Sequence, residues 1–92
     1  MTWELPATVT IPEGVAWQQV ADEVVLLNID SSEYHNLNDV GSRMWQALEE
    51  SPDVATAYTV LCDTYMVDAG KLRDDLGAFI QKLMEKGLLS TP

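Results

Sequence analysis

The one cysteine and the one histidine of this chain could serve as a nucleophile and its general base. Cys62 and His35 are remote in the sequence, and no local pattern typical of cysteine hydrolases surrounds either residue. Cys62 lies beside the apolar stripe of an expected helix, which favours a buried small hydrophobic residue. His35 alternates with Leu37 in an expected strand, which favours a partly buried strand residue or a hydrogen-bonding contact to a partner. We therefore expect no nucleophilic catalysis from this pair.

The fifteen acidic residues could in principle bind a metal or act as general acids and bases. Asp74 and Asp75 are adjacent on an expected helix, so their side chains diverge by about 100° and do not converge on one ion. Glu49 and Glu50 precede a helix break and are typical of a solvated helix end. The chain also lacks a glycine-rich phosphate loop, a paired-cysteine motif, a His-Glu-x-x-His run and a calcium loop. We expect a protein that is not an enzyme, with no metal and no cofactor.

Length and composition indicate one domain, residues 1–92, with residues 1–14 as an N-terminal extension. A formal net charge of -10 repels phosphate backbones and anionic membranes, so neither is an expected partner. Four of the five basic residues lie between positions 71 and 86, either as a solvated helix face or as a basic strip for an acidic peptide. A lone cysteine and the absence of a signal sequence favour the cytoplasm.

The first half of the chain has the alternation and turn residues of strands. The expected sheet strands are 15–21, 24–29 and 33–37, and a further short strand is possible over 8–11. Residues 24–29 are apolar on both faces, which is typical of a central strand. Trp17 is expected to pack against the sheet. Trp3 is expected either to anchor the N-terminal extension to the rest of the domain or to be an exposed contact for a partner.

The second half has the period of helices. Asn38 is the expected N-cap of the first helix, Ser51 with Pro52 is expected to start the second, and Asp68 is expected to cap the third. Gly41 is expected to allow the close approach of another backbone, and Gly87 to end the third helix. The expected apolar stripes are Val40, Met44, Trp45 and Leu48, then Val54, Ala57, Tyr58, Leu61 and Tyr65, then Leu72, Leu76, Phe79, Ile80 and Leu83, with Leu88 and Leu89 returning to the core.

Three strands followed by three helices predict an α+β fold, a winged helix-turn-helix with an N-terminal three-stranded antiparallel sheet. The strand over 33–37 would then be an edge strand without proline or lysine. It is either short enough to avoid aggregation or a site where an extended peptide adds a strand beside the third helix. Lys71 and Arg73 could steer acidic residues of that peptide. The residues expected to bind it are Glu33, Tyr34, His35, Asn36, Leu37, Lys71, Leu72, Arg73, Leu76, Phe79 and Leu83.

The stretch Tyr34–Trp45 resembles the pattern Y-x-x-L-N-x-x-G-x-x-[aliphatic]-W of the PqqD-like family. The order of Asp75-Leu76, Phe79-Ile80, Leu83 and Gly87-Leu88-Leu89 is also similar to the end of that family, and the resemblance covers roughly residues 15–89. It implies a recognition element for ribosomally synthesised, post-translationally modified peptides (a RiPP recognition element). In that family a precursor's leader peptide pairs with the third strand and packs on the third helix. The resemblance therefore implies that Asp75, on the third helix, also belongs to the peptide-binding site.

Within this family, the chain most resembles free-standing leader-binding proteins of lasso-peptide biosynthesis. The resemblance implies that catalysis belongs to a separate cysteine leader peptidase and an ATP-dependent cyclase. A winged-helix DNA-binding regulator is the alternative, although its recognition helix needs a basic face and the net charge has the wrong sign. A carrier domain is disfavoured because Ser31, Ser32 and Ser42 lie in unsuitable settings.

Overall fold

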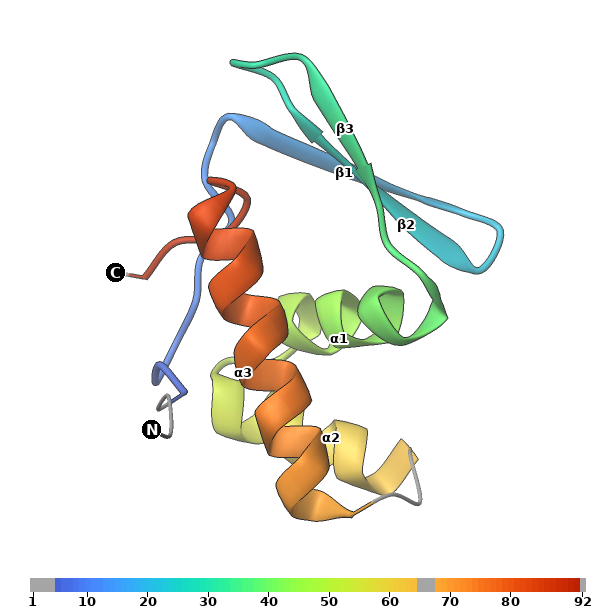
Figure 1. The fold of residues 1–92 in the computed structure, drawn as a ribbon, viewed down its shortest axis with the longest axis vertical. Coiled ribbons are helices and arrows are strands. Elements are labelled where there is room, and N and C mark those ends of the chain that lie inside the picture. Colours follow the sequence, from blue (N-terminus) through green and yellow to red (C-terminus); the bar gives the residue numbers. More distant parts are fainter. Residues whose placement is uncertain (1–4, 65–67, 92) are drawn as a thin grey trace.

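The computed structural model describes residues 5–64 and 68–91, so the predictions for Trp3 and Tyr65 lie outside the described residues. Three strands come first and three helices follow (Figure 1), which confirms the predicted α+β fold class. The elements are β1 (Val15–Val20), β2 (Glu23–Asn28), β3 (Glu33–Asn36), α1 (Asp39–Glu50), α2 (Val54–Thr64) and α3 (Ala69–Glu85).

The sheet is an antiparallel meander in the order β1-β2-β3, with the apolar strand β2 in the centre as predicted. Val24 and Leu26 point from β2 into the core and are fully buried. The first turn comes one residue earlier than expected, because Ala21 adopts a left-handed conformation (φ 58°) and Glu23 already belongs to β2. Both β1 and β3 are therefore edge strands.

Two of the three predicted helix starts are confirmed by side-chain capping. Asn38 Oδ1 accepts the Gly41 N–H at 2.8 Å, and Asp68 Oδ1 accepts the N–H groups of Gly70 and Lys71 at 2.8 and 3.2 Å. These bonds satisfy N–H groups that lack a partner within the helix.

The predicted start of α2 at Ser51 and Pro52 is wrong. The Ser51 N–H donates to the Ala47 carbonyl at 3.1 Å, so Ser51 ends α1 instead. Asp53 takes the capping role, because its Oδ1 accepts the Thr56 N–H at 2.7 Å and α2 begins at Val54.

The core lies between the sheet and the helices, with Trp45 at its centre. Trp45 is 1% exposed, and its ring meets Trp17 of β1 edge to face with centroids 6.0 Å apart. Val40 was predicted on the same stripe, but it is 47% exposed because it lies at the margin of the buried face of α1. The buried apolar residues are Val24, Leu26, Met44, Trp45, Ala47, Leu48, Val54, Ala57, Leu61, Leu72, Leu76, Ile80, Leu83, Leu88 and Leu89.

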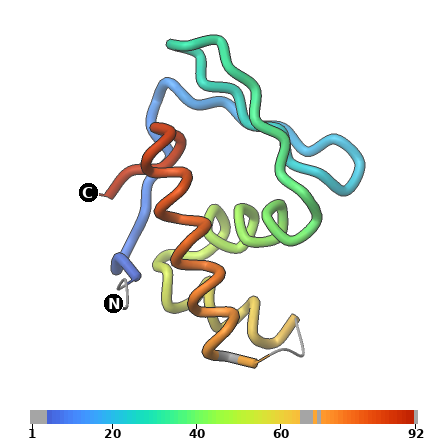
Figure 2. Tube along the Cα trace, viewed as in Figure 1, coloured from blue at the N-terminus to red at the C-terminus, as the bar shows by residue number. Residues whose placement is uncertain are grey.

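The two ends of the described chain lie side by side (Figure 2). The strand predicted over residues 8–11 is wrong as a strand, because the segment forms only one antiparallel bridge, between Thr10 and Ser90. Gly87, with φ at 73°, turns the chain after α3 so that Leu88 and Leu89 return to the core, as predicted. The N–H groups of Gly87 and Leu88 bond to the carbonyls of Met84 and Leu83, which closes the helix end.

We expect the cap at Asp53 to give the fold a measurable acid dependence. Hydrogen bonds from Thr56, first from its side chain and then from its backbone, lower the pKa of Asp53 from its ordinary value. A lowered pKa in the folded chain stabilises the fold at neutral pH, and that contribution is lost as pH falls below about 4. Asp53→Ala should therefore lower the thermal midpoint at pH 7, and the difference from wild type should shrink in acid. Asp53→Asn keeps an acceptor without the charge, and a difference for Asp53→Ala that stayed constant down to pH about 2.5 would contradict the cap.

Candidate functional site

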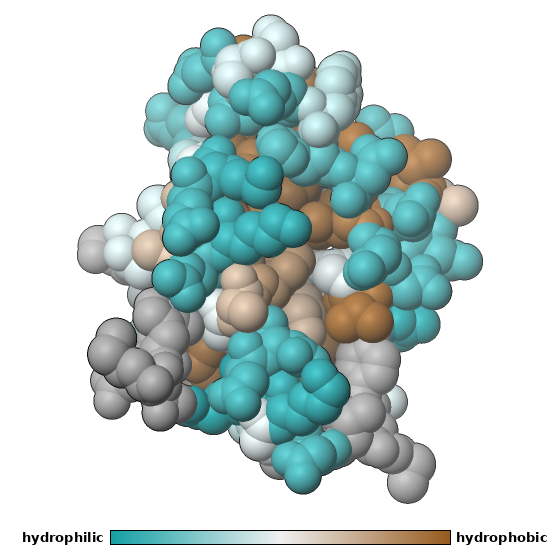
Figure 3. Space-filling view, viewed as in Figure 1, coloured by the Kyte–Doolittle hydropathy of each residue, from teal (hydrophilic) through white to brown (hydrophobic). Residues whose placement is uncertain are grey.

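A groove of about 400 Å³ separates β3 from the C-terminal half of α3. Figure 1 shows this half of α3 rising toward the sheet, and Figure 3 shows hydrophobic surface amid hydrophilic side chains on the same face. The helix residues in the groove recur at positions 79, 82, 83 and 86, which places them on one helical face. The groove is lined by Tyr34, His35, Asn36, Leu37, Asn38, Gly41, Phe79, Lys82, Leu83 and Lys86.

The register of the sheet determines which backbone groups β3 turns toward this groove. His35 lies opposite Leu26, and the Leu37 N–H donates to the Val24 carbonyl at 2.8 Å. Because hydrogen-bonded and non-bonded pairs alternate along an antiparallel ladder, residues 33, 35 and 37 bond to β2. The backbone groups of Tyr34 and Asn36 therefore point to the free edge, and no other described residue hydrogen-bonds to them.

Ser42 fixes the end of β3 against α1. Its buried hydroxyl accepts the Val24 N–H at 2.7 Å and donates to the Leu37 carbonyl at 3.1 Å. The two bonds tie the central strand, the end of the edge strand and the helix together, so they set the position of the groove wall. Sequence reasoning missed this role, because a serine within a helix carries no pattern that reports its partners.

The floor of the groove is formed where α1 and α3 approach each other. A Cβ built on Gly41 would lie 3.4 Å from Phe79 Cε1 and 3.5 Å from Leu37 Cβ. The close approach predicted at Gly41 is present, but side chains make it rather than another backbone. Phe79 is half-buried and packs against the core, so its position is fixed while one part of the ring remains open to the groove.

The basic residues of α3 divide between its two ends. Lys82 and Lys86, near the C-terminal end, line the groove and are exposed. Lys71 lies in the first turn, where its Nζ pairs with Asp75 Oδ2 at 3.2 Å, and neither Lys71 nor Arg73 lines the groove. Lys71 and Arg73 were predicted to steer the peptide, but the lysines in the groove are Lys82 and Lys86. Their spacing from Phe79 along the helix places them beside it.

The remaining predicted site residues lie around the groove rather than in it. Leu72 and Leu76 are buried in the core, 3% and 0% exposed, so they support α3 from behind. Glu33 begins β3 and is exposed. The Asp75 carboxylate forms an ion pair with Lys71. Of the predicted residues, the groove brings together Tyr34, His35, Asn36, Leu37, Phe79 and Leu83.

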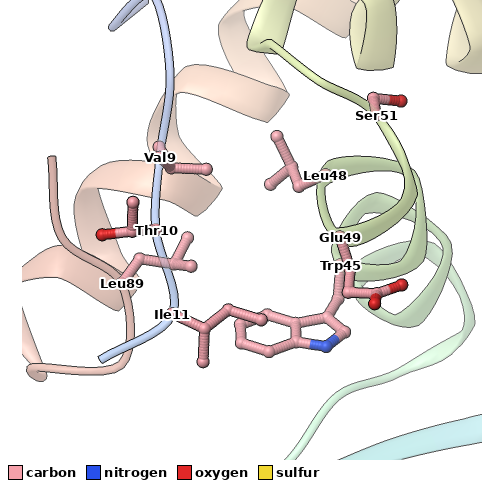
Figure 4. A pocket seen from close by; sticks show the side chains of 8 residues that line it. All are labelled: Val9, Thr10, Ile11, Trp45, Leu48, Glu49, Ser51 and Leu89. Carbon is pink, nitrogen blue, oxygen red and sulfur yellow. The ribbon is translucent and has the colours of Figure 1, made fainter. Parts of the chain in front are cut away.

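A second cavity, of about 320 Å³, lies between the N-terminal segment and α1. Figure 4 shows Val9, Ile11 and Leu89 on one side and Leu48 on the other, with the Trp45 indole at the base. Trp45 Nε1 is buried and has no hydrogen-bond partner among the described residues. Because Thr10, which is bridged to Ser90, and core side chains line it, we interpret this cavity as incomplete packing beneath the N-terminal segment.

The two residues considered for catalysis are not brought together. His35 lines the groove beside β3, whereas Cys62 lies on α2 and is not among the groove residues. Cys62 packs half-buried against the core, and its hydrogen bond with Tyr58 raises the pKa of that tyrosine. Within residues 5–64 and 68–91, no three His, Cys, Asp or Glu side chains gather as a metal site would require. None of the helices in this part of the chain is both long and apolar enough to cross a membrane.

The family model described as "Coenzyme PQQ synthesis protein D (PqqD)" matches residues 23–89, which include all three helices and the strands β2 and β3. The chain belongs to the PqqD family. The resemblance carried by Tyr34–Trp45 is thereby confirmed. No curated protein matches the chain.

Two solved structures have a fold similar to that of this chain. "TbiB1 in Complex with the TbiA(beta) Leader Peptide" is 37% identical, with a TM-score of 0.81, over 86% of this chain and 92% of that chain. "Lasso peptide synthetase B1 complexed with the leader peptide" is 28% identical, with a TM-score of 0.78, over 92% of this chain and 100% of that chain. The chain is therefore similar along nearly its whole length to two proteins whose structures contain a leader peptide.

Proposed function

We propose that this chain is a RiPP recognition element that binds the leader peptide of a ribosomal precursor by strand addition to β3. The observation that carries the proposal is the free edge at Tyr34 and Asn36, which opens onto the groove beside Phe79. Backbone hydrogen bonds to this edge supply affinity for any extended chain, and the pockets beside it select the side chains. The leader-peptide complexes of the two similar proteins support the same kind of ligand.

We propose further that the chain is not an enzyme and delivers the leader to a separate cysteine leader peptidase and an ATP-dependent cyclase of lasso-peptide biosynthesis, in the cytoplasm. Two observations support this role: the structure does not bring Cys62 and His35 together, and one similar protein is a lasso peptide synthetase B1. Delivery can be measured by reconstituting precursor cleavage with the peptidase. Adding this chain should raise the cleavage rate at low precursor concentration, and a rate independent of this chain would contradict delivery.

Removing the Phe79 ring should weaken leader binding by at least tenfold. Burial of a phenylalanine side chain is worth roughly 1.5–3 kcal/mol, and a ring held in place by the core loses little entropy when a peptide covers it. The measurement is a fluorescence-anisotropy titration of the labelled TbiA(beta) leader peptide with wild type and with Phe79→Ala. We expect saturable binding of the wild type, with a Kd between about 1 nM and 10 μM.

Phe79→Leu is the matched control, because it keeps apolar volume in the groove and should recover most of the affinity. Circular dichroism establishes that each variant is folded before its Kd is compared. Equal affinity of Phe79→Ala and wild type would exclude this groove as the binding site. A wild-type protein that shows no saturable binding would contradict recognition of the TbiA(beta) leader peptide.

A DNA-binding role has no support in the geometry. The face of α3 that carries Lys82 and Lys86 is turned to the groove beside β3, so it cannot enter a major groove as a recognition helix does. With a net charge of -10, the long-range field also opposes the approach of a phosphate backbone.

A further inference from the structure

The charge of the groove is opposite to that of the protein. Fifteen acidic residues outnumber five basic ones in the chain, yet the described residues that line the groove include no Asp or Glu. Lys82 and Lys86 contribute two of the five basic residues, and His35, the one histidine, lies across from them on β3. The groove is thus a local basic site on an acidic surface.

Neither lysine is neutralised within the protein. Among the described residues, the ion pair is Lys71–Asp75, at the other end of α3, and no carboxylate lies within ion-pairing distance of Lys82 or Lys86. Their place in and just after the last turn of α3 favours cations because the helix end carries partial negative charge. That effect accounts for basic residues at this helix end, but it does not account for the absence of carboxylates from the opposite wall.

We propose that the groove selects leader segments with Asp or Glu side chains set against Lys82 and Lys86. This inference rests on the proposed function and names the chemistry of its ligand. Carboxylates are the charge complement of ammonium groups, and the C-terminal end of a leader continues into the rest of its precursor, so the carboxylates come from side chains. The two lysines are specificity-determining residues, while the free edge of β3 provides the sequence-independent part of binding.

Bulk charge and local charge predict opposite preferences for the peptide. A net charge of -10 favours a basic peptide at long range, whereas the groove favours an acidic one at contact distance. Salt at 0.15 M screens exposed charges beyond about 8 Å, so distant carboxylates contribute little to a peptide already seated between β3 and α3. The charges within contact distance therefore determine which peptide binds, and we expect a preference for acidic peptides.

The test is selection from a display library of random twelve-residue peptides, each flanked on both sides by constant sequence. Peptides that bind wild type and lose binding to Asn36→Pro depend on the β3 edge, and we expect Asp and Glu to be enriched at least twofold among them. Unchanged acid content, or enrichment of Lys and Arg, would overturn the charge preference while leaving strand addition in place. Recovery of no edge-dependent peptide would overturn the preference and the proposed function together.

Charge reversal then locates the preference. Lys82→Glu and Lys86→Glu should each weaken a selected acidic peptide about fivefold, the upper range for one exposed ion pair. Arg43→Glu makes the same charge change on α1, outside the groove, and should alter the Kd less than twofold. Equal losses for Arg43→Glu and the two lysine variants would mean that total charge, not the groove, sets the preference. Lys82→Gln, which neutralises without reversal, should lie between wild type and Lys82→Glu.

Discussion

Asn36→Pro is expected to weaken leader binding more than tenfold while the chain remains folded. The Asn36 N–H points away from β2, so proline removes a donor that only a guest strand uses. Proline is tolerated in an edge strand where the N–H side faces solvent, and the residue before it is already extended. The guest carbonyl that loses its partner costs roughly 1–3 kcal/mol, and the proline ring also obstructs the approach of the guest backbone.

Two substitutions separate this effect from damage to the sheet. Asn36→Ala keeps the backbone donor and should bind the leader within about threefold of wild type, because it changes only the side chain. His35→Pro removes a donor that faces β2 and should destabilise the fold as well as binding. The measurements are the Kd from anisotropy and the thermal midpoint from circular dichroism. Wild-type affinity in Asn36→Pro would contradict strand addition at β3.

Trp45→Ala is expected to destabilise the protein by roughly 3–5 kcal/mol, as large-to-small changes in well-packed cores do. Trp45 is 1% exposed, packs edge-on against Trp17 and forms the base of the cavity beneath the extension. A chain of this size has a free energy of unfolding of about 5–14 kcal/mol, so this change removes a large share of it. Urea denaturation followed by circular dichroism measures the loss without depending on tryptophan fluorescence.

Trp45→Phe shows which part of the side chain matters. Trp45 Nε1 has no partner among the described residues, so phenylalanine gives up ring area but no hydrogen bond within that part of the chain. We expect a cost of about 1–2 kcal/mol, well below that of alanine. If phenylalanine and alanine proved equally destabilising, shape complementarity at the indole rather than buried apolar area would dominate the core.

The elements of the fold could be predicted because their signals are local. Asn38 and Asp68 each precede an apolar helical stripe, and a side-chain oxygen at that position satisfies N–H groups of the first turn. The predicted start of α2 was wrong because Ser51 and Asp53 both offer capping oxygens. Ser51 ends α1, so Asp53 is the residue that caps α2. The predicted burial of Val40 was wrong because periodicity locates the centre of an apolar stripe and not its margins.

The site could be predicted in outline but not in detail. The edge strand and the apolar flank of the third helix followed from strand order and helical spacing. Which amides face outward depends on the pairing register, and which lysines lie near β3 depends on the direction in which α3 crosses the sheet. Both are tertiary properties, so the sequence alone led to Lys71 and Arg73 for steering, while the groove holds Lys82 and Lys86.

Residue-resolved amide hydrogen exchange, measured by NMR with and without the TbiA(beta) leader peptide, tests strand addition most directly. The Tyr34 and Asn36 amides face solvent in the free chain, whereas the His35 amide is already bonded to β2. A guest strand must therefore slow exchange at the two even positions at saturating peptide, by more than tenfold on our account. Saturation of binding with the Tyr34 and Asn36 amides still exchanging at their free rates would contradict it.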